Sequence, residues 1–180
     1  GRSTLPEQRP FGQSRLRYAP TEAVSEDQLE AIHLASLQIL HEIGIDVLDP
    51  EARRIYAAAG ARVEGERVRM EPELVEAAMK DAPSEFVLHA VNPAHSLRLG
   101  GNWVSFGSVA SAPNVFDRDG GRRIGNITDY RNLLKLAQTL NTVHFFGGYP
   151  VEPVDIHASV RPLDATFDFL TLTDKAIHAY

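Results

Sequence analysis

Apolar residues between positions 26 and 43 recur at helical spacing and form one face of a helix. Ser25 precedes this stretch and Gln28 follows three positions later, a pattern typical of a capped helix start. Gly44 comes directly after the last apolar position, where glycine commonly ends a helix. The pattern therefore predicts a long first helix.

The rest of the first half predicts shorter helices and antiparallel strands. Asp49 followed by Pro50 is typical of a helix start, and Gly60 is expected to end that helix. Further elements follow from alternating apolar and polar residues: strands at 45–47, 61–63 and 67–70, a helix at 72–80, and an antiparallel pair at 85–89 and 96–99. Residues 21–101 are therefore expected to form an α+β segment.

Beyond residue 101, apolar strands alternate with helices. The predicted elements are a strand at 103–106, a helix from Thr128 to Leu140, a strand at 143–146, a helix at 162–172 and a strand at 175–180. Thr128 is expected to cap the first of these helices. An insertion holding Asp119-Gly120-Gly121 predicts a β-hairpin after the first strand. Strands and helices in alternation are typical of a parallel sheet.

This order predicts an α/β fold in three segments. Residues 1–20 lack periodicity and are expected to form an extended arm, which wraps a neighbouring surface or is disordered and is a candidate homo-oligomer contact. Residues 21–101 form the α+β segment, and residues 102–180 form the opening β/α units of a TIM-type barrel. Both faces of a parallel sheet must be covered, and two helices cannot cover three parallel strands. We therefore expect these residues to form only part of the barrel. An open doubly wound sheet and a self-contained three-stranded unit remain alternatives.

Composition narrows the classes of partner. The formal net charge of -6 at pH 7 argues against a nucleic-acid or anionic membrane surface, because such surfaces need clustered Lys and Arg. The sequence has no Cys, which excludes disulfides, thiolate nucleophiles and Cys-based metal sites. It also shows neither a signal-peptide pattern at the start nor an apolar run of membrane-spanning length. We therefore expect a cytoplasmic protein with a small-molecule or protein partner.

Candidate binding residues lie at the carboxyl ends of the predicted parallel strands, where α/β folds bind ligands. The three stretches are 106–111, 147–151 and 178–180. Their aromatic rings can bind a cation such as a quaternary ammonium group; they belong to Phe106, Tyr149 and Tyr180. Alternatively, these aromatic residues pack the mouth of the barrel and the neighbouring glycines form turns.

Other reactive residues carry weaker signals. No His pair has the spacing of a zinc-binding helix, so no metal site is expected. His144 and His178 lie in or near predicted strands, and each is either a general acid-base residue or a buried, hydrogen-bonded histidine. Asp117 and Asp119 lie beside several arginines, where solvated ion pairs are the usual explanation. A nucleotide cofactor lacks support, because no glycine-rich phosphate loop is present.

Several stretches match a known family in order and spacing. They are LEAIHLASLQILHEIGIDVLDPEAR at 29–53, FVLHAVNPAHSLRLGG at 86–101, VSFGSVASAPNVFD at 104–117 and NITDYRNLLKLAQTL at 126–140. Together they resemble the trimethylamine methyltransferase family of corrinoid-dependent enzymes, and the resemblance covers about residues 17–180. It rests chiefly on the helix-Gly-strand opening, the HAVNPAH segment and the FGS to APNVFD segment.

The resemblance implies a β/α barrel that binds a methylated amine or a betaine at its mouth. It implies methyl transfer to the Co(I) corrinoid (cobalamin) of a separate protein, so that no cofactor is bound directly by this chain. Relatives that act on trimethylamine use pyrrolysine, whereas relatives without it act on quaternary amines such as glycine betaine. The pyrrolysine position would lie beyond Tyr180, and this chain is expected to be a relative without pyrrolysine.

The resemblance also adds candidate substrate-binding residues and leaves the catalytic residues unassigned. The matching positions are Gly107, Ser108, Pro113 and Asn114, which join Phe106, Tyr149, His178 and Tyr180. Because most of the barrel is missing from these 180 residues, we expect them to be inactive by themselves and to act as part of a longer chain.

Two other functions stay open. The chain could be a non-catalytic binding or scaffolding module, which an exposed and apolar final strand would favour. It could instead be a different β/α-barrel enzyme that uses a Lys Schiff base, although only Lys175 begins a predicted strand.

Overall fold

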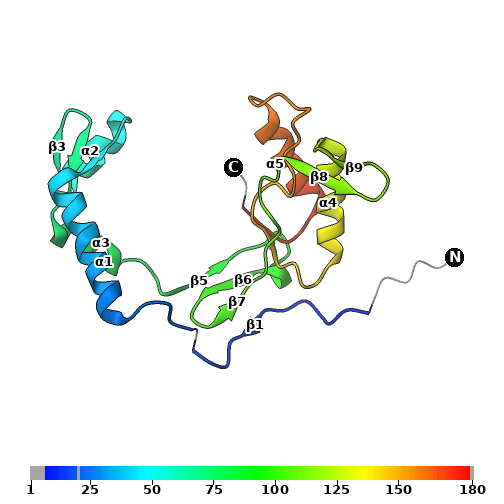
Figure 1. Ribbon diagram of the computed structural model, residues 1–180, viewed down its shortest axis with the longest axis horizontal. Helices are drawn as coiled ribbons and strands as arrows, with labels where there is room; N and C mark the ends of the chain where they lie inside the picture. Colours follow the sequence, from blue (N-terminus) through cyan, green and yellow to red (C-terminus); the bar gives the residue numbers. More distant parts are fainter. Residues whose placement is uncertain (1–6, 20, 179–180) are drawn as a thin grey trace. The chain divides into compact units, whose positions relative to one another are not determined.

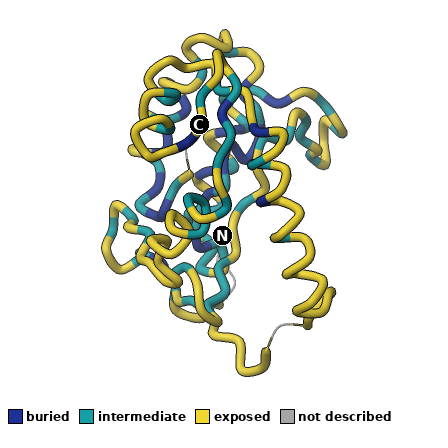
Figure 2. Tube along the Cα trace, turned by 90° about the vertical axis from the view of Figure 1, so that its left-hand side faces the viewer, coloured by how far each residue is buried: buried dark blue, intermediate teal, exposed yellow. Residues whose placement is uncertain are grey.

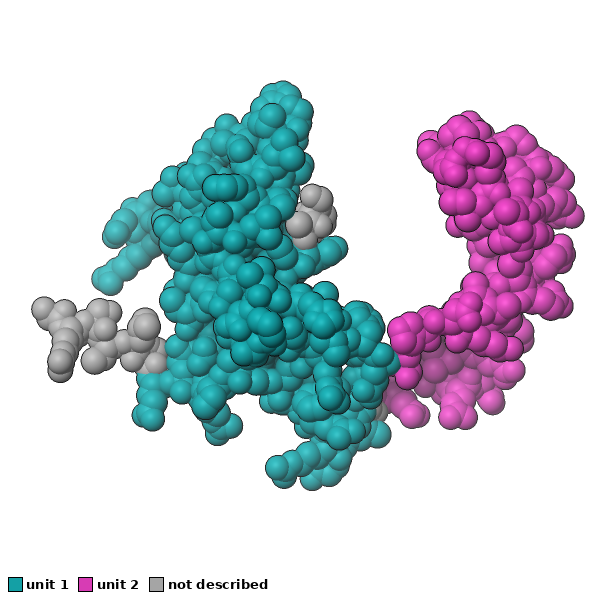
Figure 3. Space-filling model, turned by 180° about the vertical axis from the view of Figure 1, so that it is seen from behind, with its two compact units in different colours: residues 1–19, 85–180 teal, residues 20–84 magenta. Residues whose placement is uncertain are grey.

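The computed structural model describes residues 7–19 and 21–178 (Figure 1). The chain divides into two compact units (Figure 3). The helical unit covers Pro20–Ser84, and the parallel-strand unit joins Gly1–Ala19 to Glu85–Tyr180. The expected boundary near Gly101 differs from this division, because residues before Gly101 are hydrogen-bonded within the parallel-strand unit: Asn92 to Asp174, and Arg98 to Gln13.

The helical unit begins with α1, Glu26–Gln38, whose start is a complete capping box. The Ser25 side chain accepts a hydrogen bond from the Gln28 backbone N–H, and the Gln28 side chain accepts one from the Ser25 backbone N–H. This confirms the predicted cap. The helix continues as a short π-helix, Ile39–Ile43 (η1), and ends at Gly44, whose φ of 75° favours glycine.

The remaining elements of the helical unit are α2 (Pro50–Ala58), α3 (Pro72–Lys80), β2 (Ile45–Asp46), β3 (Arg62–Glu64) and β4 (Arg67–Arg69). The strands form one antiparallel sheet in the order β2-β4-β3. Asp49 caps α2 as predicted, because its side chain accepts a hydrogen bond from the Ala52 backbone N–H. The predicted helices and hairpin of this unit are confirmed.

The parallel-strand unit contains the other strands of the described chain. Its elements are β1 (Ser14–Arg15), β5 (Glu85–Leu88), η2 (Pro93–His95), β6 (Leu97–Gly100), β7 (Trp103–Val104), β8 (Asn114–Asp117), β9 (Gly121–Ile124), α4 (Ile127–Thr139), β10 (Phe145–Phe146), α5 (Arg161–Leu172) and β11 (Ala176–Ile177). Three pairs are antiparallel: β1 with β7, β5 with β6, and β8 with β9. The predicted strand pair around Asn92-Pro93 and the predicted hairpin at Asp119-Gly120-Gly121 are thereby confirmed.

The described part of the predicted arm packs along the parallel-strand unit. The Gln8 side chain accepts a hydrogen bond from the Asn141 backbone N–H and donates one to the Thr139 carbonyl oxygen. The Gln13 side chain likewise pairs with both backbone groups of Arg98. Residues 8–16 therefore lie against a neighbouring surface, whereas residues 1–6 and 20 of the predicted arm lie outside the described residues.

Three stretches of the chain run parallel. β10 pairs with β11, where Phe145 lies opposite Ala176, and Gly107 forms a parallel bridge to the same Phe145. The prediction of a first parallel strand at 103–106 was wrong in position, because β7 within that run pairs with β1 in antiparallel sense. The chain enters the parallel arrangement at Phe106, whose carbonyl oxygen accepts a hydrogen bond from the His144 N–H.

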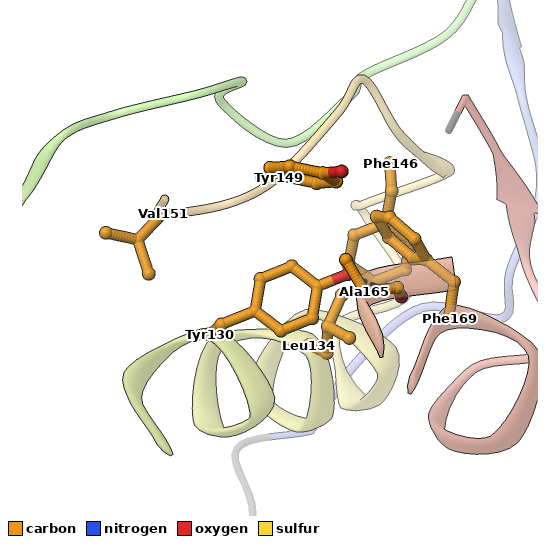
Figure 4. Close-up of a cluster of buried hydrophobic side chains, with 7 residues drawn as sticks. All are labelled: Tyr130, Leu134, Phe146, Tyr149, Val151, Ala165 and Phe169. Carbon is orange, nitrogen blue, oxygen red and sulfur yellow. Dashed lines mark hydrogen bonds between the residues drawn. The ribbon is translucent and has the colours of Figure 1, made fainter. Parts of the chain in front are cut away.

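The core of this unit lies between α4, α5 and β10. Tyr130 and Leu134 of α4, Phe146 of β10 and Phe169 of α5 are fully buried (Figure 4). The Tyr130 hydroxyl donates a hydrogen bond of 2.9 Å to the Ala165 carbonyl oxygen, which ties α4 to α5. Most of the buried residues of the described chain belong to this unit (Figure 2).

The helix α4 begins at a different cap from the predicted one. Asn126 is the N-cap, and it forms a capping box with Asp129, whereas Thr128 is an exposed residue within the first turn. Asn and Thr are both favoured cap residues, so sequence alone selected the wrong one of two positions separated by a single residue.

The described strands form five small sheets, and none of them closes into a barrel. The TIM-type barrel therefore stays a prediction for a longer chain. Within residues 7–19 and 21–178, every helix is too short or too polar to cross a membrane.

Candidate functional site

The carboxyl ends of two parallel stretches meet through backbone hydrogen bonds. Ser111, which follows the Gly107 bridge, donates its N–H to the Tyr149 carbonyl oxygen at 2.6 Å. Glu152, which follows β10, donates its N–H to the Ala112 carbonyl oxygen at 2.9 Å. These bonds bring the loops after both stretches to one edge, where parallel α/β folds bind their ligands.

A cavity of about 330 Å³ opens at this edge, and we call it the carboxyl-edge pocket. It is lined by Ser111, Tyr149, Glu152, Ala158, Arg161 and Pro162. A larger cavity of about 490 Å³ lies beside the arm and the residues that precede β10. The carboxyl-edge pocket is the better candidate site because of its position relative to the parallel strands.

Ser111 has a backbone conformation that is unusual for a residue with a side chain. Its φ is 54°, and it is the only non-glycine residue at positive φ in the described chain. Such conformations persist where the surrounding structure holds them, and they concentrate at functional sites. At this position the hydrogen bond from the Ser111 N–H to Tyr149 holds the backbone.

An ion pair forms the charged part of the pocket wall. Arg161, the first residue of α5, donates from Nη1 to Glu152 Oε2 at 3.1 Å, and their side chains are 21% and 22% exposed. The Ile156 carbonyl oxygen accepts two further bonds, from Arg161 Nε and Nη2. Backbone and carboxylate together therefore orient the guanidinium.

The structure does not bring the predicted aromatic residues together in this pocket. Tyr149 lines it but is only 4% exposed, and its ring packs edge-on against the Tyr130 ring with centroids 5.8 Å apart (Figure 4). Phe106 is 57% exposed and lines the larger cavity, where its ring stacks on His144. Tyr180 lies outside the described residues. Most of the Tyr149 ring thus packs in the hydrophobic core.

Gly107 and Ser108 follow Phe106 in the chain and precede Ser111, which lines the carboxyl-edge pocket. A Cβ at Gly107 would lie 2.6 Å from the Phe145 ring, so this crossing of two strands requires glycine. The Ser108 Oγ is buried and has no hydrogen-bond partner among the described residues. Both residues are therefore placed by close contact with β10.

The remaining candidates lie at the edges of the strands. Pro113 is exposed, and its carbonyl oxygen accepts a hydrogen bond from Gly125 N–H. Asn114 begins β8 and lies opposite Ile124. His178 is exposed and donates its backbone N–H to the Phe146 carbonyl oxygen, which extends the parallel pairing after β11.

Sequence reasoning missed Glu152 and Arg161. Glu152 lies in the loop between β10 and α5, one position beyond the candidate stretch 147–151. Arg161 is the first residue of α5, at the end of the same loop. Because ligand sites use whole strand-to-helix loops, inspection of the complete loop would have found two opposite charges there. Nothing local indicated that they pair.

His144 is a buried, hydrogen-bonded histidine. It is 3% exposed, and its Nδ1 accepts a hydrogen bond from the Phe106 backbone N–H at 2.9 Å. The proton must then lie on Nε2, which faces the Gly12 carbonyl oxygen at 3.1 Å. Both ring nitrogens therefore form hydrogen bonds to the backbone, near the amino ends of the parallel strands.

Lys175 is buried at the same amino ends. It is 1% exposed, and its Nζ donates to the carbonyl oxygens of Ala137 and Leu140 at the end of α4. Burial lowers the pKa of Lys175, although nearby Asp174 opposes that shift. Its ammonium group stabilises the end of α4. This position lies at the edge of the strands opposite the carboxyl-edge pocket, and it argues against a Schiff-base role for Lys175.

The Asn92-Pro93-Ala94-His95 motif binds Asp174. Asn92 Nδ2 donates to Asp174 Oδ2 at 3.0 Å, and His95 Nδ1 lies 2.8 Å from Asp174 Oδ1. Gln138 also donates to Asp174 Oδ1 at 2.8 Å. The motif therefore fixes the start of β11 rather than lining the carboxyl-edge pocket.

No group of three or more His, Asp or Glu side chains in the described part of the chain is placed to bind a metal ion. Opposite charges in the carboxyl-edge pocket suit polar or zwitterionic ligands instead. The wall formed by Ala158, Pro162 and Tyr149 suits alkyl groups.

A sequence model of the family described as "Trimethylamine methyltransferase (MTTB)" matches residues 2–180. The chain is 38% identical to a glycine betaine methyltransferase of Desulfitobacterium hafniense over 152 residues, 84% of this chain and 32% of that relative. It is 31% identical to a trimethylamine methyltransferase of the same species over 145 residues, 76% of this chain and 28% of the relative. A trimethylamine methyltransferase of Methanosarcina mazei is 30% identical over 159 residues, 84% of this chain and 32% of the relative. The chain spans about a third of the length of these relatives.

Proposed function

Since the chain belongs to the trimethylamine methyltransferase family, we propose that it is part of a longer enzyme that transfers a methyl group from a methylated or quaternary amine. The acceptor in this proposal is the Co(I) of a corrinoid held by a separate protein. The observation that carries the proposal is the family match over residues 2–180. The carboxyl-edge pocket supports it, because it lies where a β/α enzyme binds its substrate.

The chemistry sets clear demands on the pocket. When bound, the corrinoid supplies a Co(I) nucleophile. The methyl group would pass to that nucleophile as its C–N bond breaks, and the electron pair of the bond would stay on nitrogen, so that a quaternary nitrogen becomes a neutral tertiary nitrogen. The chain's own residues must therefore orient the amine and exclude water, since a desolvated and aligned substrate reacts faster.

The described pocket meets part of these demands. Its apolar wall of Ala158, Pro162 and the Tyr149 edge can contact methyl groups, and its charged wall can fix polar groups. The scaffolding alternative gains no support from β11, because Ala176 is fully buried and Ile177 is half-buried.

The test uses the complete polypeptide that contains this chain. Purified protein is mixed with reduced corrinoid protein and either glycine betaine or trimethylamine, and the demethylated amine is measured by mass spectrometry. We expect the demethylated product to appear only when both proteins are present. Failure of every methylated amine to react with a competent corrinoid protein would overturn the proposal.

A further inference from the structure

We infer that residues 11–13 of the arm clamp the amino ends of the three parallel stretches and thereby keep the opposite, carboxyl ends of these stretches ordered. The segment is Phe11-Gly12-Gln13, and we call it the amino-end clamp. Figure 1 shows the arm, in dark blue, along one side of the parallel-strand unit. The inference does not depend on the proposed function, because it concerns how this unit holds its own strands in place.

Two residues of the clamp form hydrogen bonds at the starts of two parallel stretches. Gln13 Nε2 donates to Ser105 Oγ at 2.7 Å, and Ser105 comes shortly before the Gly107 bridge. The Gly12 carbonyl oxygen accepts a hydrogen bond from His144 Nε2 at 3.1 Å, directly before β10. The clamp therefore joins the starts of two neighbouring stretches through adjacent residues.

The Phe11 ring contacts the start of the third stretch, β11. Lys175 directly precedes β11, and its Nζ lies 5.9 Å from the centroid of the Phe11 ring, within the range of a cation–π interaction. The same ring packs against the rings of His144 and His95, with centroids 5.4 Å and 4.4 Å away. A single side chain thus contacts the residues that precede β10 and β11.

The clamp is anchored on both sides by glutamine side chains. Gln8 accepts a hydrogen bond from the Asn141 backbone N–H and donates one to the Thr139 carbonyl oxygen. Gln13 pairs in the same way with both backbone groups of Arg98. A side-chain amide that uses its donor and its acceptor together has few possible orientations. These two anchors therefore fix the position of the residues between them.

The parallel stretches depend on such support because they share few hydrogen bonds with each other. β10 and β11 pair over two residues each, and Gly107 adds a single bridge to β10. The hydrogen bonds of the Ser111 and Glu152 N–H groups, which join the carboxyl ends, lie only a few residues further along the same stretches. Segments with few contacts open together, so loss of the clamp at one end is expected to loosen the other end.

The test measures hydrogen–deuterium exchange by mass spectrometry in the complete polypeptide that contains this chain. Phe11→Ala removes the ring contacts of the clamp. We expect exchange to become about tenfold faster or more, both in the arm and at the backbone N–H groups of Ser111 and Glu152. The N–H of Arg53 in α2 belongs to the helical unit and should keep its exchange rate.

Matched variants separate the clamp from the general effect of losing a ring. Phe11→Tyr keeps the ring and should retain protection close to that of the unmodified protein. Phe116→Ala removes a ring of the same size from an exposed position in β8 and should leave the exchange of Ser111 and Glu152 unchanged. Circular dichroism of each variant shows whether it remains folded.

Two results would overturn the inference. The first is faster exchange confined to the arm, which would mean that the arm docks without ordering the strands. The second is unchanged exchange in both places. If Phe11→Ala unfolds, Gln13→Ala, which removes only hydrogen bonds, must show the selective loss of protection at Ser111 and Glu152, and protection that persists there would overturn the inference as well.

Discussion

Asp174 is the residue that the Asn92-Pro93-Ala94-His95 motif binds. Its carboxylate accepts hydrogen bonds from Asn92 and Gln138 and pairs with His95. Burial favours the neutral carboxyl, but these partners outweigh burial, and the pKa of Asp174 lies below its usual value. The motif at 92–95 is thus tied to a residue about eighty positions later.

Substitution of Asp174 should therefore have a pH-dependent effect on stability. A carboxyl whose pKa is lower in the folded protein stabilises the fold above its unfolded pKa, and this stability is lost as pH falls through the folded pKa. Asp174→Asn should lower the free energy of unfolding at pH 7 and should differ less from the unmodified protein below about pH 3. Urea unfolding at both pH values measures the difference. An equal difference at both would show that ionisation of Asp174 contributes nothing.

Helix α4 shows the limits of local signals at the scale of an element. Asn126 accepts a hydrogen bond from the Asp129 backbone N–H, and the Asp129 side chain accepts one from the Asn126 backbone N–H. Arg123 of β9 also binds Asp129, and this hydrogen bond holds the pKa of Asp129 below its usual value. The β8–β9 hairpin and the start of α4 therefore stabilise each other.

The position of the cap can be tested with two alanine variants. Asn126→Ala removes the side-chain acceptor and should lower the free energy of unfolding by about 1 kcal/mol. Thr128→Ala changes an exposed residue of the first turn and should alter it by less than about 0.5 kcal/mol. Chemical unfolding followed by circular dichroism gives both values. A larger loss in Thr128→Ala would restore the predicted cap.

For the whole molecule, burial decides which apolar residues stabilise the fold. Phe167 and Phe169 both belong to α5, yet Phe167 is 65% exposed and Phe169 is fully buried. The Phe169 ring packs against Tyr130 of α4 and Phe146 of β10. A single side chain thus joins three elements of the core (Figure 4).

Alanine at each of these two positions should give very different results. Phe169→Ala leaves a cavity between α4, α5 and β10, and should lower the free energy of unfolding by about 3–5 kcal/mol. Phe167→Ala removes a ring of the same size from an exposed position and should have an effect near 0.5 kcal/mol or less. Thermal or urea unfolding measures both. Comparable losses would mean that Phe167 is also covered in the intact protein.

The sequence by itself determined the elements whose signals are local. The first capping box, the Asp49-Pro50 start, the small hairpins and the parallel order of the last two strands were predicted because caps, turns and periodicity depend on neighbouring residues. The family was also recognisable, since its motifs occur in order along the chain.

Only the tertiary structure decided how distant residues meet. It placed Tyr149 in the core and Phe106 at another cavity, and it paired Glu152 with Arg161 in the carboxyl-edge pocket. It also moved the first parallel contact to Gly107. The physical reason is the same in each case: burial and charge pairing depend on which surfaces pack together, and residues adjacent in sequence do not specify that packing.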